Sequence, residues 1–293
     1  MQETYVLVTA ARNEEAYIER TIESVIAQTV LPQKWVIVSD NSTDRTDKIV
    51  KRYAEQYDFI ELMRLESNGE RNFARQVYGQ QAGAERLQNI KYDFIGMLDA
   101  DISVKPDYYE AILRRFGQNA RLGLAGGILF DHLDGKWVRQ CVSVSWSVSG
   151  PVQMFRRQCF GQIGGYLPLE KGGQDGIAEV MARMHGWEVK SFPDLEVLHY
   201  RCTGTQDSHL LSACFNAGIR EYSNGYHPLF EIIKCISRFR QKPYVVGGLL
   251  RLSGYCRAFL RRDRQEIPDD VVAYRRREQL HRLHAALLGR RLQ

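Results

Sequence analysis

Short apolar runs alternate with amphipathic stretches over the first hundred residues of the chain. Runs rich in β-branched and aromatic residues have the length of buried strands at 5–9, 35–39, 59–65 and 94–98. Between them, apolar residues recur at helical spacing around Ile18–Ile26, Ile49–Tyr53 and 72–88. Strands that alternate with helices form right-handed βαβ units, and such units build a mostly parallel sheet. The pattern therefore predicts an α/β fold whose sheet is flanked by helices.

The pattern becomes less regular after about residue 120. Two further stretches have strand character, at 123–130 and 137–148. Two helices are expected near the end, at 228–239 and 244–260, each beginning near a proline. We therefore expect two domains: an α/β domain and a basic, amphipathic helical tail, covering 1–232 and 233–293.

Charge is distributed unevenly along the chain. From Lys234 onward there are 15 Lys and Arg against 5 Asp and Glu, whereas the preceding residues hold 25 against 30. The acidic body weighs against nucleic acid as a partner, and no nucleic-acid-binding motif occurs. The tail mixes basic and apolar residues, which suits docking on an anionic membrane surface. Packing of the same helices on the body of the protein is an open alternative.

Nothing in the sequence indicates export or membrane crossing. A strand-like run begins at Tyr5 without the regions of a signal peptide, and no apolar run reaches 18 residues. The six cysteines are scattered without a CxxC pair, which fits a reducing compartment and no zinc site. We therefore expect a cytoplasmic protein that lies at the inner face of the membrane where its tail docks.

The fourth apolar run, FIGML, leads directly into two carboxylates, Asp99 and Asp101. Buried carboxylates are costly unless a cation neutralises them. Side chains two residues apart in an extended segment point to one side, so both could face one ligand. Mn²⁺ or Mg²⁺ takes such oxygen ligands together with substrate phosphates. Pro106 is expected at the first position of the next helix.

Polar loops also follow the other three predicted strands. These loops are ARNEE at 11–15, SDNSTD at 39–44 and NGERNFAR at 68–75. The carboxyl ends of parallel strands meet at one edge of a sheet, where α/β folds bind ligands. Helix capping, for example by Asn13 or Ser42, would explain any single loop. Polar and charged residues after all four predicted strands favour a ligand site.

Taken together, the motifs resemble the family 2 glycosyltransferases of GT-A fold. The resemblance covers roughly residues 3–202 and rests on TAARNEE, VSDNSTDRT, NGERNFARQ, LDAD, SGPVQMFRR, GQIGGY, GGQDGIAEVMARMHGW and FPDLEVLH. It implies a Rossmann-like GT-A sheet and a nucleotide-diphosphate-sugar donor. It also implies Mn²⁺ or Mg²⁺ as cofactor and transfer with inversion at the sugar.

The resemblance also assigns site residues. The nucleotide-binding positions would be Ala11, Glu14, Asp40, Arg75, Asp99 and Ala100. The metal ligands would be Asp99, Asp101 and, as in some members, His199. The general base would be Asp175. Two positions depart from the family: Ser39 precedes Asp40, and Gln174 precedes Asp175, where the family often has adjacent acids.

We therefore expect an inverting glycosyltransferase that moves a sugar, most simply from a UDP-linked donor, to a hydroxyl of a saccharide or lipid-linked acceptor. Glycolipid and polysaccharide precursors are such acceptors. A haloacid-dehalogenase-type phosphatase is an alternative because DADIS resembles its nucleophile motif, although that motif normally follows the first strand. A nucleotidylyltransferase would need a Gly-rich loop that ARNEE lacks. A non-catalytic sugar-nucleotide-binding module is the remaining alternative.

Overall fold

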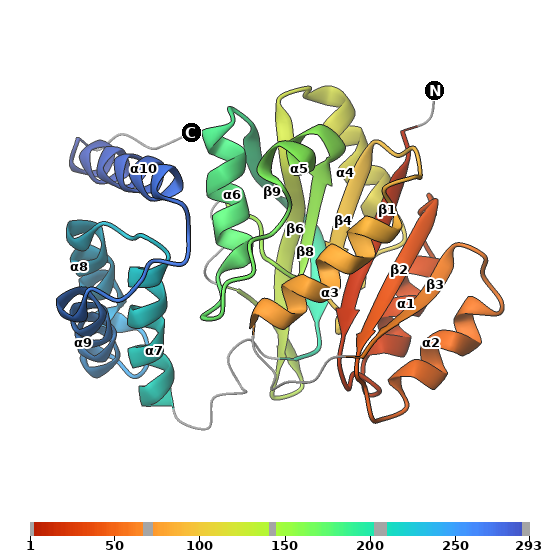
Figure 1. The fold of residues 1–293 in the computed structure, drawn as a ribbon, viewed down its shortest axis with the longest axis horizontal. Coiled ribbons are helices and arrows are strands. Elements are labelled where there is room, and N and C mark those ends of the chain that lie inside the picture. The colour runs from red at the N-terminus through yellow and green to blue at the C-terminus, as the bar shows by residue number, and fades with distance from the viewer. Residues whose placement is uncertain (1–2, 67–72, 141–144, 202–209, 289–293) are drawn as a thin grey trace. The chain divides into compact units, whose positions relative to one another are not determined.

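The computed structural model of the chain describes residues 3–66, 73–140, 145–201 and 210–288 (Figure 1). Two compact units make up the chain. One contains residues 1–168 and 174–203, and the other contains residues 169–173 and 204–293. They are described separately below. The division at 232/233 expected from the sequence stays a prediction, because the packing units and a boundary of activity need not coincide.

The first unit is built on a nine-stranded sheet. Its strands are β1 (Tyr5–Ala11), β2 (Lys34–Asp40), β3 (Ile60–Leu65), β4 (Phe94–Leu98), β5 (Ile102–Val104), β6 (Leu122–Leu133), β7 (Lys136–Arg139), β8 (Val152–Arg156) and β9 (Glu188–His199). The order is β3-β2-β1-β4-β8-β6-β9-β5, and β7 pairs with β6. β3, β2, β1 and β4 are parallel neighbours, as are β6 and β9, whereas β8, β5 and β7 pair antiparallel. The predicted α/β fold with a mostly parallel sheet is confirmed.

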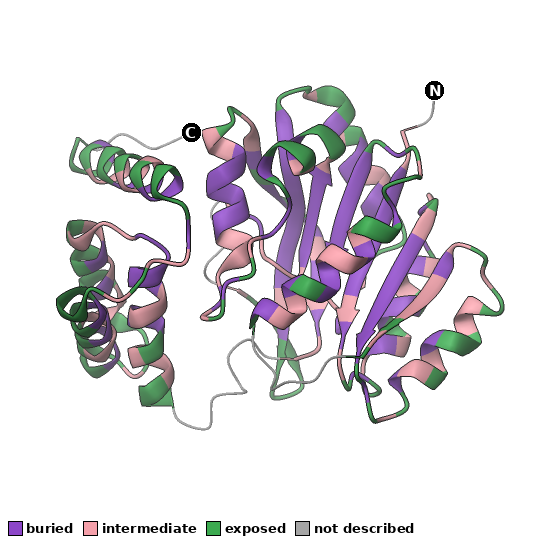
Figure 2. Ribbon diagram, viewed as in Figure 1, coloured by how far each residue is buried: buried purple, intermediate pink, exposed green. Residues whose placement is uncertain are grey.

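Helices cover both faces of this sheet. They are α1 (Ile18–Ile26), α2 (Thr46–Ala54), α3 (Phe73–Arg86), α4 (Tyr108–Gln118), α5 (Arg157–Ile163) and α6 (Gln174–Met184). Alternate residues of β1 serve the two faces: Leu7 joins the core with α1 and α4, while Val8 faces α3. Gly83 permits the second contact, because a Cβ there would lie 2.5 Å from Cγ1 of Val8. The strands β1, β2 and β4 are therefore buried on both sides (Figure 2), whereas β7 is exposed.

Two local predictions were wrong. α4 begins at Tyr108, and Pro106 instead lies before the helix, where its carbonyl accepts the Thr29 N–H at 2.8 Å. Of the strand expected at 137–148, the structure has β7, while 141–144 lie outside the described residues and 145–148 are not a strand. In residues 145–148 the backbone bonds to a side chain and not to a neighbouring strand at Val148, whose N–H donates to the Glu179 carboxylate at 2.7 Å.

The second unit is helical. It contains α7 (Leu210–Ser223), α8 (Pro228–Ser237), a 3-10 turn η1 (Arg238–Arg240), α9 (Val245–Arg261) and α10 (Asp269–Leu287). α7 and α9 approach each other backbone to backbone, since a Cβ at Gly254 would lie 2.1 Å from the Phe215 carbonyl oxygen. Both helices expected from the sequence are present with small shifts. No helix in the described part of the chain has the length and hydropathy needed to cross a membrane.

Candidate active site

The loops after β1 and β2 are bonded to each other at the carboxyl edge of the sheet. Ala11 pairs with Ser39 in the strand register, so the two loops start side by side. Asn13 donates its N–H to Ser42 Oγ at 3.1 Å and accepts the Thr43 N–H at 2.8 Å through its side chain. The residues that precede α1 and α2 are Tyr17 and Arg45, and neither caps its helix through a side chain. The capping explanation of Asn13 and Ser42 is therefore wrong.

The predicted nucleotide-binding residues Asp40 and Arg75 lie together at this edge. Asp40 is buried at the end of β2, and its Oδ2 lies 3.4 Å from Arg75 Nε and 3.6 Å from Arg12 Nη1. Ala11 is buried at the end of β1. The sequence placed Asp40 and Arg75 in different loops, and the fold joins them in one ion pair.

Glu14 has a partner that the sequence analysis missed. Its buried carboxylate is held by both terminal nitrogens of Arg201, with Nη1 at 3.1 Å, and its N–H donates to Thr46 Oγ1 at 2.7 Å. Arg201 Nε also lies 3.6 Å from Asp101 Oδ2. Arg201 thus connects the first loop with the acidic turn after β4. Its position two residues after His199 was the available signal.

Asp99, Ala100 and Asp101 form a turn between β4 and β5. The expectation that both carboxylates face one side of an extended segment was therefore wrong in its premise. The turn is fixed because Thr21 Oγ1 donates to the buried Ala100 carbonyl at 2.7 Å and accepts the Ile102 N–H at 3.1 Å. The two carboxylates remain close enough for the charge of Asp101 to act on Asp99.

The two acids of the turn have different surroundings. Asp99 accepts a hydrogen bond from Gln76 Nε2 at 3.1 Å, and its N–H donates to the Pro151 carbonyl at 2.9 Å. Burial and then the charge of Asp101 raise the pKa of Asp99 to about 7. Asp101 is buried beside His199, whose Nε2 lies 3.6 Å from Asp101 Oδ2.

His199 is oriented by Asp131, a second residue that the sequence analysis missed. The strand register places Asp131 of β6 beside His199 of β9, and the Asp131 Oδ1 to His199 Nδ1 distance is 2.7 Å. Burial opposes charge on the imidazole, but the carboxylates of Asp101 and Asp131 outweigh it and raise its pKa to about 9. Asp131 stands at the end of the apolar run 123–130, as Asp99 does after FIGML, and that likeness was the available signal.

The donor set bears on the expected divalent metal. A carboxylate beside an imidazole that is oriented by a second carboxylate is a frequent arrangement around metals. Asp101 and His199 fit such an ion with Asp131 behind them. Asp99 does not complete a cluster with them: within the described ranges, no group of three or more metal-ligating side chains converges.

Asp175 lies in the first turn of α6. A Cβ at Gly150 would lie 2.7 Å from Asp175 Oδ2, so the backbone at Gly150 packs closely against the Asp175 side chain. The next residue, Pro151, binds the Asp99 N–H through its carbonyl. The charges of Asp175 and Asp99 also both act on the buried Tyr166, whose pKa burial raises well above its usual value. Segment 149–151 therefore brings Asp175 to the acidic turn.

Glu179 holds this segment one turn further along α6. Its Oε1 accepts the Val148 N–H and, at 2.9 Å, the Ser147 hydroxyl. Burial raises the pKa of Glu179 to about 7, with Arg183 opposing that shift. Beside Asp175, the Oε1 of Gln174 is buried and has no hydrogen-bond partner in the described structure. Gln174 stands at the sequence position where the family often has an acid.

A parallel β3-β2-β1-β4 half joined through an acidic turn to a mixed half is the architecture of GT-A glycosyltransferases. The chain belongs to Glycosyl transferase family 2, whose sequence pattern matches residues 6–161. Both the family and the GT-A fold expected from the motifs are thereby confirmed.

Solved structures of the same fold include two with bound nucleotide sugars. The mannosyltransferase PcManGT from Pyrobaculum calidifontis, in complex with GDP-Man and Mn²⁺, has a TM-score of 0.57 and 14% identity and covers 98% of this chain and 81% of its own. Residues 1–349 of S. aureus TarS in complex with UDP-GlcNAc have a TM-score of 0.56 and 14% identity, covering 88% and 73%. At these identities the likeness concerns the fold.

Curated relatives match over a shorter stretch. The putative glycosyltransferase EpsH of Bacillus subtilis (strain 168) is 30% identical over 119 residues, which are 40% of this chain and 31% of EpsH. A poly-beta-1,6-N-acetyl-D-glucosamine synthase of Staphylococcus aureus (strain COL) is 28% identical over 118 residues, 40% of this chain and 26% of that protein. The match thus spans less than a third of the length of either relative.

Proposed function

We propose that this chain is an inverting, metal-dependent glycosyltransferase that moves a sugar from a UDP-linked donor to a hydroxyl of a glycolipid or polysaccharide precursor. The observation that carries the proposal is the approach of Asp175 to the acidic turn at Asp99 through segment 149–151. Membership of family 2 favours this reaction over phosphate hydrolysis. The UDP-GlcNAc complex of TarS and the polysaccharide synthase among the relatives support the choice of donor and acceptor class.

The chemical step needs a group that removes the proton from the attacking acceptor hydroxyl. Asp175 is suited to this role because a carboxylate within hydrogen-bond reach of the hydroxyl acts as a general base. Gln76 and the Pro151 carbonyl orient Asp99, which would face the donor. Arg75, beside Asp40, would place positive charge near the diphosphate.

Mn²⁺ or Mg²⁺, when bound, would supply positive charge against the departing diphosphate. Asp101 and His199 would hold the ion, and Asp131 keeps the imidazole in position for it. Asp99 would contact the ribose or the ion from the same turn. The nucleotide base would lie against Ala11, Glu14 and Ala100.

Donor binding gives the most direct test. Thermal shift with Mn²⁺ and a panel of UDP-, GDP- and dTDP-sugars should identify one responsive nucleotide, because a ligand at 100 times its Kd stabilises the folded state by about 2.7 kcal/mol. Proton NMR of the product with that donor should show an inverted anomeric configuration. The absence of a response to any of the sugars would contradict the proposal. Binding without transfer to any acceptor would favour the non-catalytic module.

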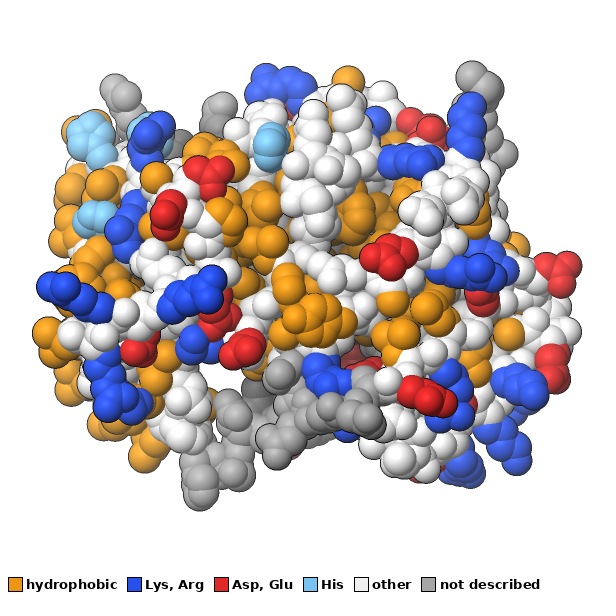
Figure 3. Space-filling view, in the orientation of Figure 1, with side chains coloured by type: hydrophobic (Ala, Val, Ile, Leu, Met, Phe, Trp, Pro, Cys, Tyr) orange, Lys and Arg blue, Asp and Glu red, His pale blue; other side chains and the backbone are white. Residues whose placement is uncertain are grey.

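For location, we propose that the helical unit docks on an anionic membrane surface. α8 exposes Leu229, Ile232, Ile233 and Ile236 at helical spacing, with 41–55% of each residue accessible. The exposed cations Arg240 and Lys242 follow, and then Tyr244, Val245, Val246 and Leu249 of the α9 end are exposed as well. Figure 3 shows hydrophobic and basic side chains together over this unit, on the left of the view. Apolar side chains interleaved with cations are typical of interfacial helices.

One cation of the basic tail does not belong to this surface. Arg251 binds the Glu221 carboxylate inside the unit. Co-sedimentation with phosphatidylcholine vesicles, with and without phosphatidylglycerol, tests the remaining surface. The wild type should pellet only with phosphatidylglycerol, and the double variant Ile232→Asn, Ile236→Asn should not pellet. Leu31→Asn, at an equally exposed leucine of the other unit, is the control. Equal pelleting of the wild type and the double variant would contradict docking.

A further inference from the structure

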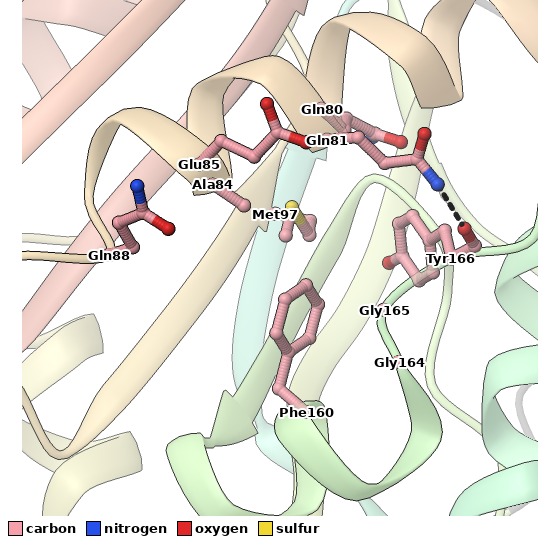
Figure 4. A pocket seen from close by; sticks show the side chains of 10 residues that line it. All are labelled: Gln80, Gln81, Ala84, Glu85, Gln88, Met97, Phe160, Gly164, Gly165 and Tyr166. Carbon is pink, nitrogen blue, oxygen red and sulfur yellow. Dashed lines mark hydrogen bonds between the residues drawn. The ribbon is translucent and has the colours of Figure 1, made fainter.

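A cavity of about 420 Å³ lies in the first unit, between α3 and the segment that leaves α5 (Figure 4). Its lining consists of Gln80, Gln81, Ala84, Glu85, Gln88, Met97, Phe160, Gly164, Gly165 and Tyr166. Figure 4 shows the α3 side chains on one side and the Phe160 ring on the other, with Met97 between them. The cavity therefore has an apolar floor and a polar wall.

The polar wall contains an unsatisfied acceptor. Gln80 is 5% exposed, and its Oε1 is buried without a hydrogen-bond partner. An unsatisfied buried polar atom costs about 1–3 kcal/mol, so such atoms call for an explanation. The amide of Gln81 already has a hydrogen-bond partner within the protein, because its Nε2 donates to the Tyr166 carbonyl at 3.0 Å. Less than 1 Å² of Gln80 Oε1 is accessible, so a ligand hydroxyl in the cavity would bond to it, and remove the cost, once the amide turns toward the cavity.

The lining selects among classes of ligand. None of these ten described residues is Lys or Arg, so the cavity offers no charged partner to a phosphate or nucleotide. A purely apolar ligand would make no use of the amides of Gln80 and Gln88 or of the carboxylate of Glu85, and the side chains of Glu85 and Gln88 are exposed. A sugar ring suits both walls: its C–H face can pack on Phe160 and Met97 while its hydroxyls bond the amides, each of which donates and accepts.

The cavity lies next to the site along α3, and its lining includes neither Gln76 nor Asp99. Gln76, which binds Asp99, lies one helical turn before Gln80. From Gln80 to its end at Arg86 the helix rises about 9 Å, and Gln88 lies in the turn beyond, so the lining is longer than one sugar ring. Tyr166 closes the end near the acidic turn, where its hydroxyl donates to Gln153 Oε1 at 2.6 Å.

We propose that this cavity is a binding subsite for a neutral oligosaccharide, and that it holds a part of the acceptor remote from the reacting hydroxyl. The identification of the saccharide as acceptor rests on the proposed function. The proposal that a neutral oligosaccharide binds in the cavity does not rest on the proposed function.

Saturation-transfer NMR and calorimetry on the full chain test binding directly. The probes are tetrasaccharides of β-1,4- and β-1,6-linked N-acetylglucosamine and of β-1,4- and α-1,4-linked glucose. At least one should bind. Gln80→Leu should weaken that binding about tenfold without loss of stability, because an apolar replacement removes the unsatisfied atom. Gln88→Ala should weaken it as well, whereas Asn89→Ala, at an exposed neighbour outside the lining, should not.

The donor thermal shift on the same variants separates the two proposals. Retained donor response with weakened saccharide binding in Gln80→Leu and Gln88→Ala supports the subsite. The inference alone is overturned if donor binds but no tetrasaccharide does, or if both variants bind the saccharide like the wild type. Saccharide binding without any donor response would leave the subsite standing and contradict the glycosyltransferase.

Discussion

Two carboxylates in this chain, Glu221 and Asp99, have different hydrogen-bond partners. In the helical unit, the Glu221 carboxylate accepts hydrogen bonds from Lys234 and from Nε and Nη2 of Arg251. The two bonds from Arg251 measure 2.6 and 2.5 Å. Although burial opposes it, these cations hold the pKa of Glu221 well below its usual range. At the sheet edge, Asp99 has the neutral amide of Gln76, and its pKa is raised.

The difference distinguishes Glu221 from Asp99, whereas Glu14, Asp40 and Asp101 at the sheet edge also have cationic partners. Removing the Glu221 carboxylate would leave its cations buried and uncompensated. A carboxylate with a neutral donor retains attraction for a cation that arrives with the ligand. The comparison predicts that substitutions at the sheet edge reduce transfer with little effect on stability, and that substitutions in the helical unit do the reverse.

The largest effect is expected from Asp175→Asn. Asn retains the shape and caps a helix nearly as well but cannot accept the proton, so the transfer rate should fall about 10²- to 10⁴-fold. The melting temperature and donor affinity should stay near the wild-type values. Asp134→Asn, in the exposed turn of the β6–β7 hairpin, is the control and should keep full activity. A variant that keeps more than about a tenth of the wild-type rate would contradict the role of Asp175 as general base.

Glu221→Gln should have the next largest effect, on stability. It leaves Lys234 and Arg251 without their main counter-charge, and breaking such a buried pair costs about 3–5 kcal/mol. Urea denaturation followed by circular dichroism measures the loss. The control is Glu110→Gln, which breaks the exposed pair with Arg114 and should cost at most about 0.5 kcal/mol. Equal urea midpoints for Glu221→Gln and Glu110→Gln would contradict a stabilising role for the ion pairs of Glu221.

A smaller effect is expected from Asp131→Asn, which acts through His199. Loss of a carboxylate that orients a metal-binding imidazole weakens metal affinity or activity about 10- to 100-fold. The Mn²⁺ concentration for half-maximal activity should rise, and saturating Mn²⁺ should restore most of the rate. Unchanged Mn²⁺ dependence would show that Asp131 serves only the packing of β6 and β9.

Much of the first unit could be predicted from the sequence because its signals are local. The strands β1, β2 and β4 are unbroken apolar runs, and each is followed by polar residues at the edge where ligands bind. The short strand β5 gave no such signal, since Ile102–Val104 is defined by pairing with β9. Its presence converts Asp99–Asp101 from an extended segment into a turn.

The partners of the site residues could not be predicted, because they depend on register and on long-range packing. Arg201 reaches Glu14 across 187 positions of sequence, and Asp131 meets His199 only through the pairing of β6 with β9. In the helical unit, the composition of α9 suggested a basic surface, yet Arg251 is already bound to Glu221. Sequence shows that charge is present and structure shows which charges are already paired.

The pH dependence of the helical cluster depends on Glu231. Glu231 is fully buried beside Glu221 and accepts a hydrogen bond from the Cys235 thiol at 3.1 Å. Burial and the charge of Glu221 raise its pKa from 4.5 to about 7. Folded Glu231 therefore keeps a proton that the unfolded chain releases above pH 4.5, so its contribution to stability is complete below 4.5 and declines as pH rises toward 7.

The decline cannot exceed about 1.4 kcal/mol per pH unit, since one proton is involved. Urea midpoints of the wild type should fall over this range more steeply than those of Glu231→Gln, which cannot titrate. Above pH 7 the two curves should run parallel, because Glu231 is then ionised in both the folded and the unfolded state. Parallel curves between pH 4.5 and 7 would mean that Glu231 is already ionised in the folded protein, with Lys234 and Arg251 as its counter-charges as well as those of Glu221.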